Sequence, residues 1–196
     1  MKVEFEVPTW RQIHLMLLNL AGKIRRSNFK PDVIIAVSRG GCIPARVLSD
    51  LLETPTGNVG VDFYLGIAET KKAPVLTQNV TVPVAGKKAI VVDDVVDSGK
   101  SLKLVKTLLF QQGAMDAQVA TIYYKHWSII KPDYYARETK RWVVFPWETK
   151  ETIRRIFEKY RDETTVNVEI AKLVKAGLPK QLAKRFLKEM SEEEPC

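Results

Sequence analysis

The chain of 196 residues has few of the side chains that cross-link a protein or form metal centres, with only two cysteines and two histidines. Cys42 and Cys196 are too few for a disulfide framework or a cysteine metal site, so a reducing cytoplasm is the expected setting. No apolar run reaches membrane-spanning length, no signal peptide opens the chain, and no repeat or low-complexity segment is visible. We therefore expect a soluble, intracellular protein without a membrane partner.

The chain is basic, with 31 Lys and Arg residues against 23 Asp and Glu residues and a formal net charge of +8. Such a balance is found in nucleic-acid-binding proteins, but here the cations are spread along the chain rather than clustered with aromatic residues. A basic solvated surface and phosphate-rich small substrates explain the charge equally well, so nucleic acid is not an expected partner. A hydrophobic content of 45% is enough for one α/β domain with a small appendage.

The most informative stretch is an apolar run that leads into acids and a small-residue loop. Residues 89–92 are apolar and mostly β-branched, which predicts a buried strand, and we expect that strand to end at Asp93 and Asp94. Turn-forming residues follow over 97–101, and apolar positions recur at helical spacing over 102–110. In an open α/β sheet, a loop between a strand and a helix offers backbone N–H groups and the positive end of the helix dipole to a phosphate.

Three acids, Asp93, Asp94 and Asp97, are unusual beside an anion site, because their charges would repel a phosphate. Hydroxyl groups and a hard cation such as Mg²⁺ are the natural partners of carboxylates. The stretch therefore predicts a ligand with a phosphate at one end and a diol with a metal at the other. A nucleotide-binding P-loop is excluded, because it requires a glycine five residues before Gly99, where this chain has Asp94. A capped strand-to-helix turn with solvated acids is the remaining structural alternative.

This segment resembles the phosphoribosyl pyrophosphate (PRPP) signature of the type I phosphoribosyltransferases. The resemblance implies an α/β fold with a mostly parallel central sheet flanked by helices, and a small hood. It also implies that Asp93 and Asp94 hold the ribose hydroxyls and Mg²⁺, and that Asp97 lies near purine N7 as the catalytic acid–base group. The residues implied to bind the 5′-phosphate are Ser98, Gly99, Lys100 and Ser101.

A second glycine-containing loop, Ser-Arg-Gly-Gly, follows the apolar strand expected over 33–37 and precedes a helix expected over 45–52. Two glycines between a strand and a helix indicate close approach of the backbone to an anion, although a plain turn is the common alternative. Beside the first loop, this one resembles the pyrophosphate-binding loop of the same family, and particularly of its bacterial xanthine-guanine branch. The resemblance implies PRPP contacts from Ser38, Arg39 and Gly40, and a cis peptide between Arg39 and Gly40.

Two further segments resemble purine-binding parts of the 6-oxopurine branch. Lys125 follows the strand expected over 117–124, where the family has a lysine that bonds the purine 6-oxygen; a surface lysine is the alternative. An ammonium group has donors only, so it favours a carbonyl over the amino group of adenine. The pattern Trp-x-x-x-Pro-Trp-acid implies that Trp142 stacks on the base, that the Val143 backbone bonds its edge, and that Glu148 joins the metal site.

The remaining N-terminal half is predicted from apolar spacing and polar runs. A helix is expected from Thr9 to about residue 27, with Thr9 as its N-cap. A strand is expected over 59–65, and the polar segment 66–88 predicts a long loop of the kind that serves as a lid.

Beyond Thr149 the pattern becomes helical, with helices expected over 151–160, 166–176 and 180–190. Their apolar faces must be covered by the domain or by a second subunit. We therefore divide the chain into a phosphoribosyltransferase domain with a hood over 1–148 and a C-terminal helical extension over 149–196, and we expect a homodimer or a higher homo-oligomer.

The resemblance implies a purine salvage enzyme that transfers the phosphoribosyl group of PRPP to hypoxanthine, guanine or xanthine and releases pyrophosphate. Val144 stands where the bacterial xanthine-guanine enzymes have an acid, so the preferred base is left open. One alternative is a phosphoribosyltransferase for another base. A second is a regulator that binds PRPP without turnover and whose basic C-terminal residues bind nucleic acid; these are Lys180, Lys184, Arg185 and Lys188.

Overall fold

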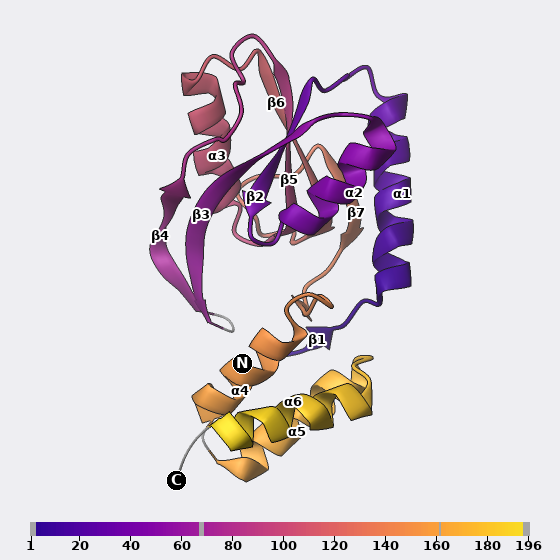
Figure 1. Cartoon of the computed structure of the whole chain (residues 1–196), viewed down its shortest axis with the longest axis vertical. Coiled ribbons are helices and arrows are strands. Elements are labelled where there is room, and N and C mark those ends of the chain that lie inside the picture. Colours follow the sequence, from indigo (N-terminus) through magenta and orange to yellow (C-terminus); the bar gives the residue numbers. More distant parts are fainter. Residues whose placement is uncertain (1–2, 67–68, 161, 194–196) are drawn as a thin grey trace. The chain divides into compact units, whose positions relative to one another are not determined.

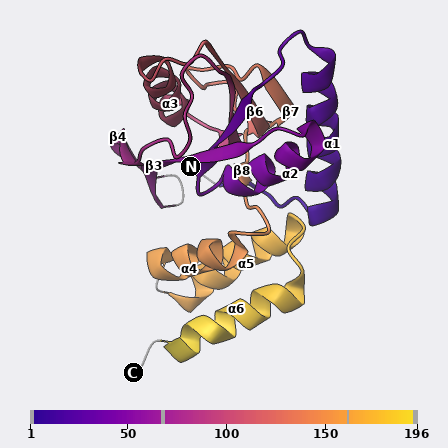
Figure 2. The same ribbon diagram turned by 45° about the horizontal axis from the view of Figure 1, so that its top comes forward.

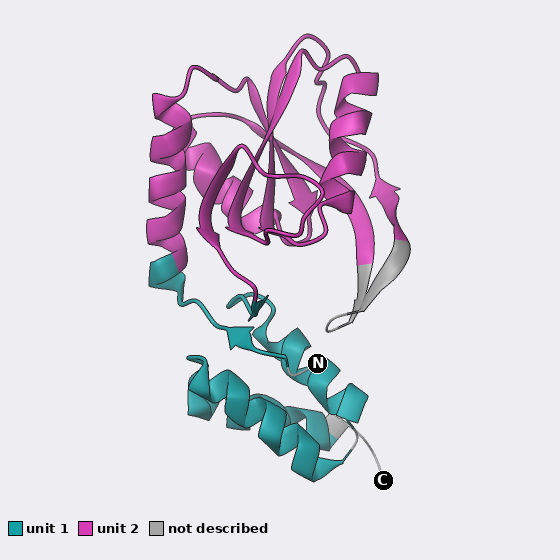
Figure 3. Cartoon of the chain, turned by 180° about the vertical axis from the view of Figure 1, so that it is seen from behind, with its two compact units in different colours: residues 1–12, 65–69, 141–196 teal, residues 13–64, 70–140 magenta. Residues whose placement is uncertain are grey.

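The structure is a computed structural model that describes residues 3–66, 69–160 and 162–193 (Figure 1). The chain forms two compact units, each of which is described by itself (Figure 3). The smaller unit comprises residues 1–12, 65–69 and 141–196, and the larger unit comprises residues 13–64 and 70–140. Every helix in the described ranges is too short or too polar to cross a lipid bilayer.

The larger unit is built on a six-stranded sheet in the order β4-β3-β2-β5-β6-β7. Its strands are β2 (Val33–Ser38), β3 (Thr56–Gly66), β4 (Glu69–Gln78), β5 (Lys88–Val96), β6 (Asp116–Tyr124) and β7 (Tyr134–Glu138). The pairs β2–β3, β2–β5, β5–β6 and β6–β7 are all parallel. Because adjacent parallel strands end at the same edge of a sheet, the segments that follow β2, β5 and β6 meet there.

Both faces of the central strands are buried, which explains why the sequence shows continuous apolar runs there. One cluster joins alternate β2 residues to the apolar face of α3 (Lys100–Gln111), and its members include Val33, Ile35, Val37, Leu102, Val105 and Leu109. The intervening Ile34 and Ala36 point to the opposite face, where they are also buried. Figures 1 and 2 show α3 on one side of the sheet, with α1 (Trp10–Arg26) and α2 (Cys42–Leu52) on the other.

Helix α1 begins where the sequence predicts, because Thr9 caps it. The Gln12 N–H donates to Thr9 Oγ1 at 3.3 Å, and the Thr9 N–H donates to Gln12 Oε1 at 2.8 Å. This reciprocal pair is a capping box, which satisfies donors that a helix N-terminus leaves unpaired. The predicted helix is confirmed, and its apolar stripe is buried at Ile13, Leu17, Leu20, Ala21 and Ile24.

Strand β5 is longer than the sequence indicates. It runs to Val96, so Asp93 and Asp94 lie within the strand rather than after it. In the register with β6, Asp93 lies opposite Thr121 and Val96 opposite Tyr124. The neighbouring strand supplies backbone partners beyond the apolar run, and this pairing overrides the low strand propensity of aspartate.

The polar segment over 66–88, expected to be a loop, contains an edge strand instead. Residues 67–68 lie outside the described ranges, but β4 occupies residues 69–78 and is hydrogen-bonded to β3. Pro74 and two consecutive lysines made this segment resemble a loop. Proline and lysine are tolerated in an edge strand, because one side of its backbone has no partner strand. The expectation of a loop is therefore wrong for β4, and closure of this segment as a lid stays a prediction.

The smaller unit contains β1 (Phe5–Glu6), β8 (Trp142–Val143), α4 (Thr149–Tyr160), α5 (Glu163–Lys175) and α6 (Lys180–Glu193). The two short strands are parallel and pair Phe5 with Trp142. The three predicted helices are confirmed, and they bury an apolar cluster of Phe5, Val144, Ile153, Ile156, Val166, Ile170, Leu173, Leu178 and Ala183. Most of the apolar positions are thus covered within the unit, although Val168 is 51% exposed. The domain boundary after Glu148 stays a prediction.

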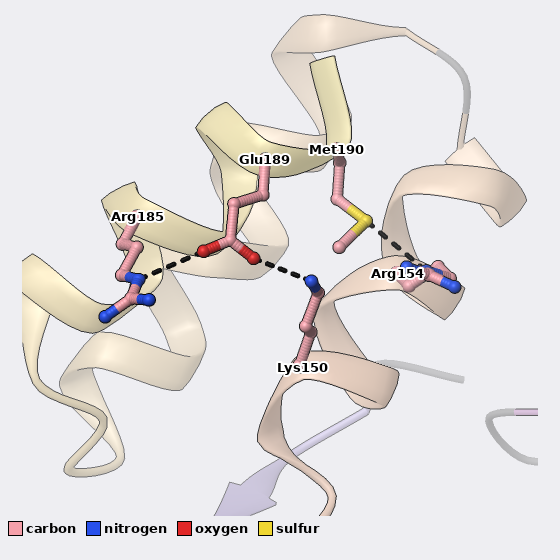
Figure 4. A network of polar contacts seen from close by, with 5 residues as sticks. All are labelled: Lys150, Arg154, Arg185, Glu189 and Met190. Carbon is pink, nitrogen blue, oxygen red and sulfur yellow. Dashed lines mark hydrogen bonds and ion pairs between the residues drawn. The ribbon is translucent and has the colours of Figure 1, made fainter. Parts of the chain in front are cut away.

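A polar network joins α4 to α6 around Glu189 (Figure 4). The Glu189 carboxylate accepts a hydrogen bond from Lys150 Nζ of α4 at 2.6 Å and one from Arg185 Nε of α6 at 3.0 Å. Beside it, Arg154 Nε donates to Met190 Sδ at 3.5 Å. The hydrogen bond from Lys150, followed by that from Arg185, lowers the pKa of Glu189.

Glu189→Gln should lower the melting temperature near neutral pH and have little effect in strong acid. Because the pKa of Glu189 is lower in the folded protein than in the unfolded chain, its carboxylate stabilises the fold above the unfolded value of about 4.3. That contribution is lost as the pH falls through the folded pKa. Thermal melts at about pH 7 and about pH 2 check this. Glu158→Gln, on the exposed surface of α4, is the control. A difference of equal size at both pH values would contradict the assignment.

Candidate active site

The carboxyl ends of β2, β5 and β6 bring most of the predicted site residues to one edge of the larger unit. A pocket at this edge is lined by Asp93, Val95, Val96, Asp97, Ser98, Gly99, Ser101 and Leu102. Ser38 ends β2, the loop after it carries Arg39 and Gly40, and Lys125 directly follows β6. Residues predicted from three separate segments of the sequence therefore lie on adjacent strands.

The loop after β5 has the backbone geometry of an anion site. Gly99 precedes α3 with a φ of 77°, a conformation that favours glycine. The first intrahelical hydrogen bond of α3 runs from the Lys103 N–H to Gly99 O at 3.0 Å. The N–H groups of residues 100–102 therefore have no partner four residues earlier within the helix. One of these, the Lys100 N–H, donates to Ser98 Oγ at 3.4 Å. Ser98 and Ser101 line the pocket, so the loop offers hydroxyl groups and a helix N-terminus to a phosphate.

The loop after β2 leads into α2, which begins at Cys42, three residues earlier than expected. Pro44 lies in the first turn, where a missing N–H removes no intrahelical bond. The helix start is fixed by the loop itself, because the Cys42 N–H donates to Arg39 O at 3.1 Å.

The cis peptide of this loop joins Ser38 to Arg39, which corrects the expected position between Arg39 and Gly40 by one residue. Ser38 Oγ lies 3.5 Å from Cys42 Sγ. The two basic residues predicted to bind PRPP both have exposed side chains. Arg39 lies in the loop after β2, and Lys100 lies at the start of α3. Lys100 Nζ lies 5.8 Å from the centroid of the Phe63 ring.

Gly40 and Gly41 allow the loop after β2 to pack directly against strand β5. A Cβ atom on Gly40 would lie 2.5 Å from Asp94 Oδ2, and one on Gly41 would lie 2.2 Å from the backbone oxygen of Val92. Gly40 therefore sets the position of a predicted ligand-binding carboxylate. Gly41 allows the backbones of the loop and β5 to touch.

Gly40→Ala and Gly41→Ala should have different consequences. The Gly40 variant displaces the Asp94 carboxylate, so PRPP affinity should fall about tenfold or more, the equivalent of about one charged hydrogen bond. The Gly41 variant meets backbone, so it should lose about 1–3 kcal/mol of unfolding free energy through overpacking. Calorimetric titration with PRPP and denaturant unfolding separate the two effects. Gly22→Ala is the control, because its Cβ would meet only the flexible Arg26 side chain, at 3.3 Å. Equal stability losses at positions 40 and 41 would contradict this account.

The paired acids at the end of β5 repel each other. Asp94 is buried, with 7% exposure, and its N–H donates to Asp93 Oδ1 at 3.0 Å. Burial, reinforced by the Asp94 carboxylate, raises the pKa of Asp93 well above its ordinary value, and the Asp94 N–H only partly opposes this. Hydroxyl donors or a cation would relieve the repulsion.

The acid pair fits a Mg²⁺ ion that takes some of its ligands from the protein and the others from a substrate and water. Among the described residues, no group of three or more acidic, histidine or cysteine side chains is placed to hold a metal. Mg²⁺ in phosphate-processing sites usually takes one or two carboxylates and completes its shell with water and substrate oxygens. Asp93 and Asp94 match that donor set.

Asp97 and Lys125 form an ion pair just beyond the carboxyl ends of the adjacent strands β5 and β6. Lys125 Nζ lies 2.8 Å from Asp97 Oδ2, and Lys125 is only 5% exposed. The Lys125 backbone N–H also donates to Val96 O at 2.9 Å, which ties the segment after β6 to the end of β5. Both residues are site candidates from the sequence alone. Their contact was not predicted, because only the pairing of β5 with β6 brings them together.

Sequence reasoning missed Trp127, whose indole Nε1–H donates to Asp97 Oδ1 at 2.7 Å. The chain has four tryptophans, and nothing in the local sequence around Trp127 distinguishes it from a packing residue. Its relation to Asp97 follows only from the adjacency of β5 and β6.

The three remaining predicted residues belong to the smaller unit. The Trp142 N–H donates to the carbonyl of Glu4, just before β1, and the Val144 N–H donates to the carbonyl of Glu6, both at 2.8 Å. The Val143 N–H between them therefore faces away from β1. Glu148 Oε1 accepts a hydrogen bond from the Phe145 N–H at 3.2 Å. The larger unit therefore holds the predicted PRPP-binding residues and Lys125, and the roles of all these residues, like those of Trp142, Val143 and Glu148, stay predictions.

Comparison with known proteins identifies the relatives of this chain. The xanthine-guanine phosphoribosyltransferase of Gluconobacter oxydans (strain 621H) is 31% identical over 154 residues, which cover 75% of this chain and 86% of the relative. The enzyme of the same name from Cereibacter sphaeroides (strain ATCC 17025 / ATH 2.4.3) is 30% identical, with 71% and 84% covered. The crystal structure of a purine phosphoribosyltransferase from Pyrococcus horikoshii Ot3 matches with a TM-score of 0.65 and 40% identity, over 73% of this chain and 93% of that one.

The family model for the phosphoribosyl transferase domain matches residues 9–154, a range that includes both loops, Asp97 and Lys125. The predicted α/β fold with a mostly parallel sheet flanked by helices is confirmed by this match and by the strand order. A family model that spans most of the chain, together with relatives aligned over most of their own length, shows that the chain belongs to the phosphoribosyltransferase family.

Proposed function

We propose that this protein is a purine salvage enzyme. It transfers the phosphoribosyl group of PRPP to a 6-oxopurine, namely hypoxanthine, guanine or xanthine, and releases pyrophosphate. The relatives support this proposal. Those from Gluconobacter oxydans and Cereibacter sphaeroides are named xanthine-guanine phosphoribosyltransferases, and that from Pyrococcus horikoshii is named a purine phosphoribosyltransferase.

The observation that carries the proposal is the Asp97–Lys125 pair beside the pocket. Lys125 ends in an ammonium group, which can only donate and therefore suits a carbonyl oxygen. Asp97 ends in a carboxylate, which can accept a proton from a ring nitrogen. A 6-oxopurine has its carbonyl oxygen and N7 on the same edge, so a single base can meet both groups.

In the proposed reaction, purine N9 forms a bond to the anomeric carbon while the bond from that carbon to pyrophosphate breaks. Positive charge grows on the ribose and negative charge on the leaving pyrophosphate. The negative carboxylates of Asp93 and Asp94 would stabilise the positive charge on the ribose. Arg39 and the N–H groups of the loop would stabilise the negative charge on the pyrophosphate. The proton that the base loses from N7 passes to the carboxylate of Asp97. No covalent nucleophile is needed.

Asp93 and Asp94 would hold Mg²⁺ together with oxygens of the donor, and Glu148 is the further predicted ligand. When bound, the ion neutralises charge on the leaving pyrophosphate. Trp142 would stack on the base and the Val143 backbone would bond its edge. The proposal also includes a domain boundary after residue 148, assembly into a homodimer or larger homo-oligomer, and a cytoplasmic location.

The test is pyrophosphate release by the purified protein with Mg²⁺ and PRPP, measured separately with guanine, hypoxanthine, xanthine, adenine and uracil. Release with one or more 6-oxopurines supports the proposal and ranks the substrates. Release with adenine or uracil alone would identify a phosphoribosyltransferase for another base. PRPP binding without release for any base would favour the regulator.

A further inference from the structure

We infer that Trp127 is a positioning residue for the transfer, which holds the Asp97 carboxylate and the Lys125 ammonium group where they meet the base. This role presupposes the proposed function. It is carried by the contacts of one indole ring with both groups of the pair.

Each oxygen of the Asp97 carboxylate has its own donor. Trp127 Nε1 donates to Oδ1 at 2.7 Å, and Lys125 Nζ donates to Oδ2 at 2.8 Å. Two donors on opposite oxygens fix the rotation of a carboxylate about its terminal bond, which a single donor does not. The Lys125 Nζ also lies 5.3 Å from the centroid of the Trp127 ring, within the range of a cation–π contact. Trp127 therefore restrains the proton acceptor and the carbonyl-binding cation together.

Trp127 is itself anchored, because it projects from a turn tied to β5 and its loop at both ends. Before it, the Lys125 N–H donates to Val96 O at 2.9 Å. After it, the Ile129 N–H donates to Ser98 O at 3.1 Å. The turn and the phosphate-binding loop are thus joined by backbone hydrogen bonds, so the indole is held in a fixed relation to Asp97.

The indole can remain in place while a base binds. A carboxylate has about four lone-pair positions, of which Trp127 and Lys125 occupy two. The others can accept the proton from purine N7. Trp127 is 47% exposed, so a packing role would bury only about half of its side chain. Its N–H group is the property that phenylalanine cannot replace.

The first experiment tests the hydrogen bond without any substrate. The chain has four tryptophans, and the indole ¹H–¹⁵N cross-peak that is missing from Trp127→Phe identifies that of Trp127. In Asp97→Asn, this cross-peak should move while the other three stay in place. An unchanged position would overturn the contact, whatever reaction the protein catalyses.

The second experiment tests the role in catalysis. Trp127→Phe keeps an aromatic ring over Lys125 but removes the donor, so kcat for a 6-oxopurine should fall about tenfold while the KM for PRPP is unchanged. Ile129→Ala, in the same turn, is the matched control, because its side chain is 59% exposed and its backbone N–H is retained. A wild-type kcat in Trp127→Phe would overturn the inference and leave the proposed function standing. If the wild-type protein transfers to no base, the proposed function fails and the positioning role fails with it.

Discussion

Asp97→Asn is expected to lower kcat by about 10²- to 10⁴-fold while PRPP affinity stays nearly constant, the range associated with loss of a general acid–base group. An amide cannot take the proton that leaves N7, and it cannot form the ion pair with Lys125, which lies 2.8 Å away in the wild type. The predicted PRPP-binding residues lie at the ends of β2 and β5 and in the segments that follow them, and a substitution of the same size should leave their geometry unchanged. Because Lys125 is 5% exposed and loses its charged partner, the melting temperature should also fall.

Single-turnover kinetics with saturating PRPP, together with calorimetric PRPP binding, measure the two parts of this expectation. Asp116→Asn is the matched control, because its carboxylate lies at the start of β6, far along the strand from Lys125, and accepts a hydrogen bond that an amide oxygen can also accept. Unchanged turnover in Asp97→Asn would remove Asp97 from catalysis. A parallel loss of PRPP binding would show that it binds the donor instead.

Asp93→Asn should weaken PRPP binding and stabilise the protein in the absence of ligand. Loss of a charged acceptor at the proposed site of the ribose hydroxyls corresponds to about 1.5–3 kcal/mol, or about 10- to 150-fold in affinity. Stability should change in the opposite direction, because the variant removes the repulsion between the two carboxylates. The amide oxygen can still accept the bond from the Asp94 N–H, which is 3.0 Å long in the wild type.

The sign of the stability change follows from the raised pKa of Asp93. As the pH rises above about 3.9, the unfolded chain releases this proton first, so the wild-type fold loses stability until the folded pKa is passed. Asp93→Asn removes that loss. Melting temperatures in the absence of metal should therefore be equal near pH 4 and higher for the variant at about pH 7.

Asp50→Asn, on the exposed surface of α2, controls for the general effect of removing a negative charge. It should change neither PRPP affinity nor the pH dependence of melting. If Asp93→Asn melts below the wild type at neutral pH, the carboxylate stabilises the empty site, and the assigned repulsion is wrong.

The parts of the fold that follow from local composition were predictable from the sequence. The Val33–Val37 run is buried on both sheet faces, and such burial leaves a continuous apolar signal. Thr9 and Gln12 form a local capping box, so the start of α1 depends on residues only three apart. The predicted PRPP-binding residues lie in or beside local strand-to-helix connections, which explains why their motifs can be recognised in the sequence.

Features that depend on neighbouring strands were not predictable in this way. The extension of β5 to Val96 depends on pairing with β6, and the strand at β4 depends on an edge position that tolerates Pro74. Trp127 is separated from Asp97 by 30 positions, and their hydrogen bond requires the register of β5 and β6. A pattern of local spacing contains no information on such a contact.

The backbone bonds between the loop after β5 and the turn after β6 also bear on motion. The amides of Lys125 and Ile129 donate to Val96 and Ser98, so neither loop can unfold locally without breaking bonds of the other. Such coupled segments open as one cooperative unit, and their amides exchange hydrogen for deuterium with a shared free energy of opening. A ligand that orders the phosphate loop should thus slow exchange in the turn next to the base as well. If PRPP binds this loop as proposed, its occupancy should in this way be transmitted to the proposed site of the base.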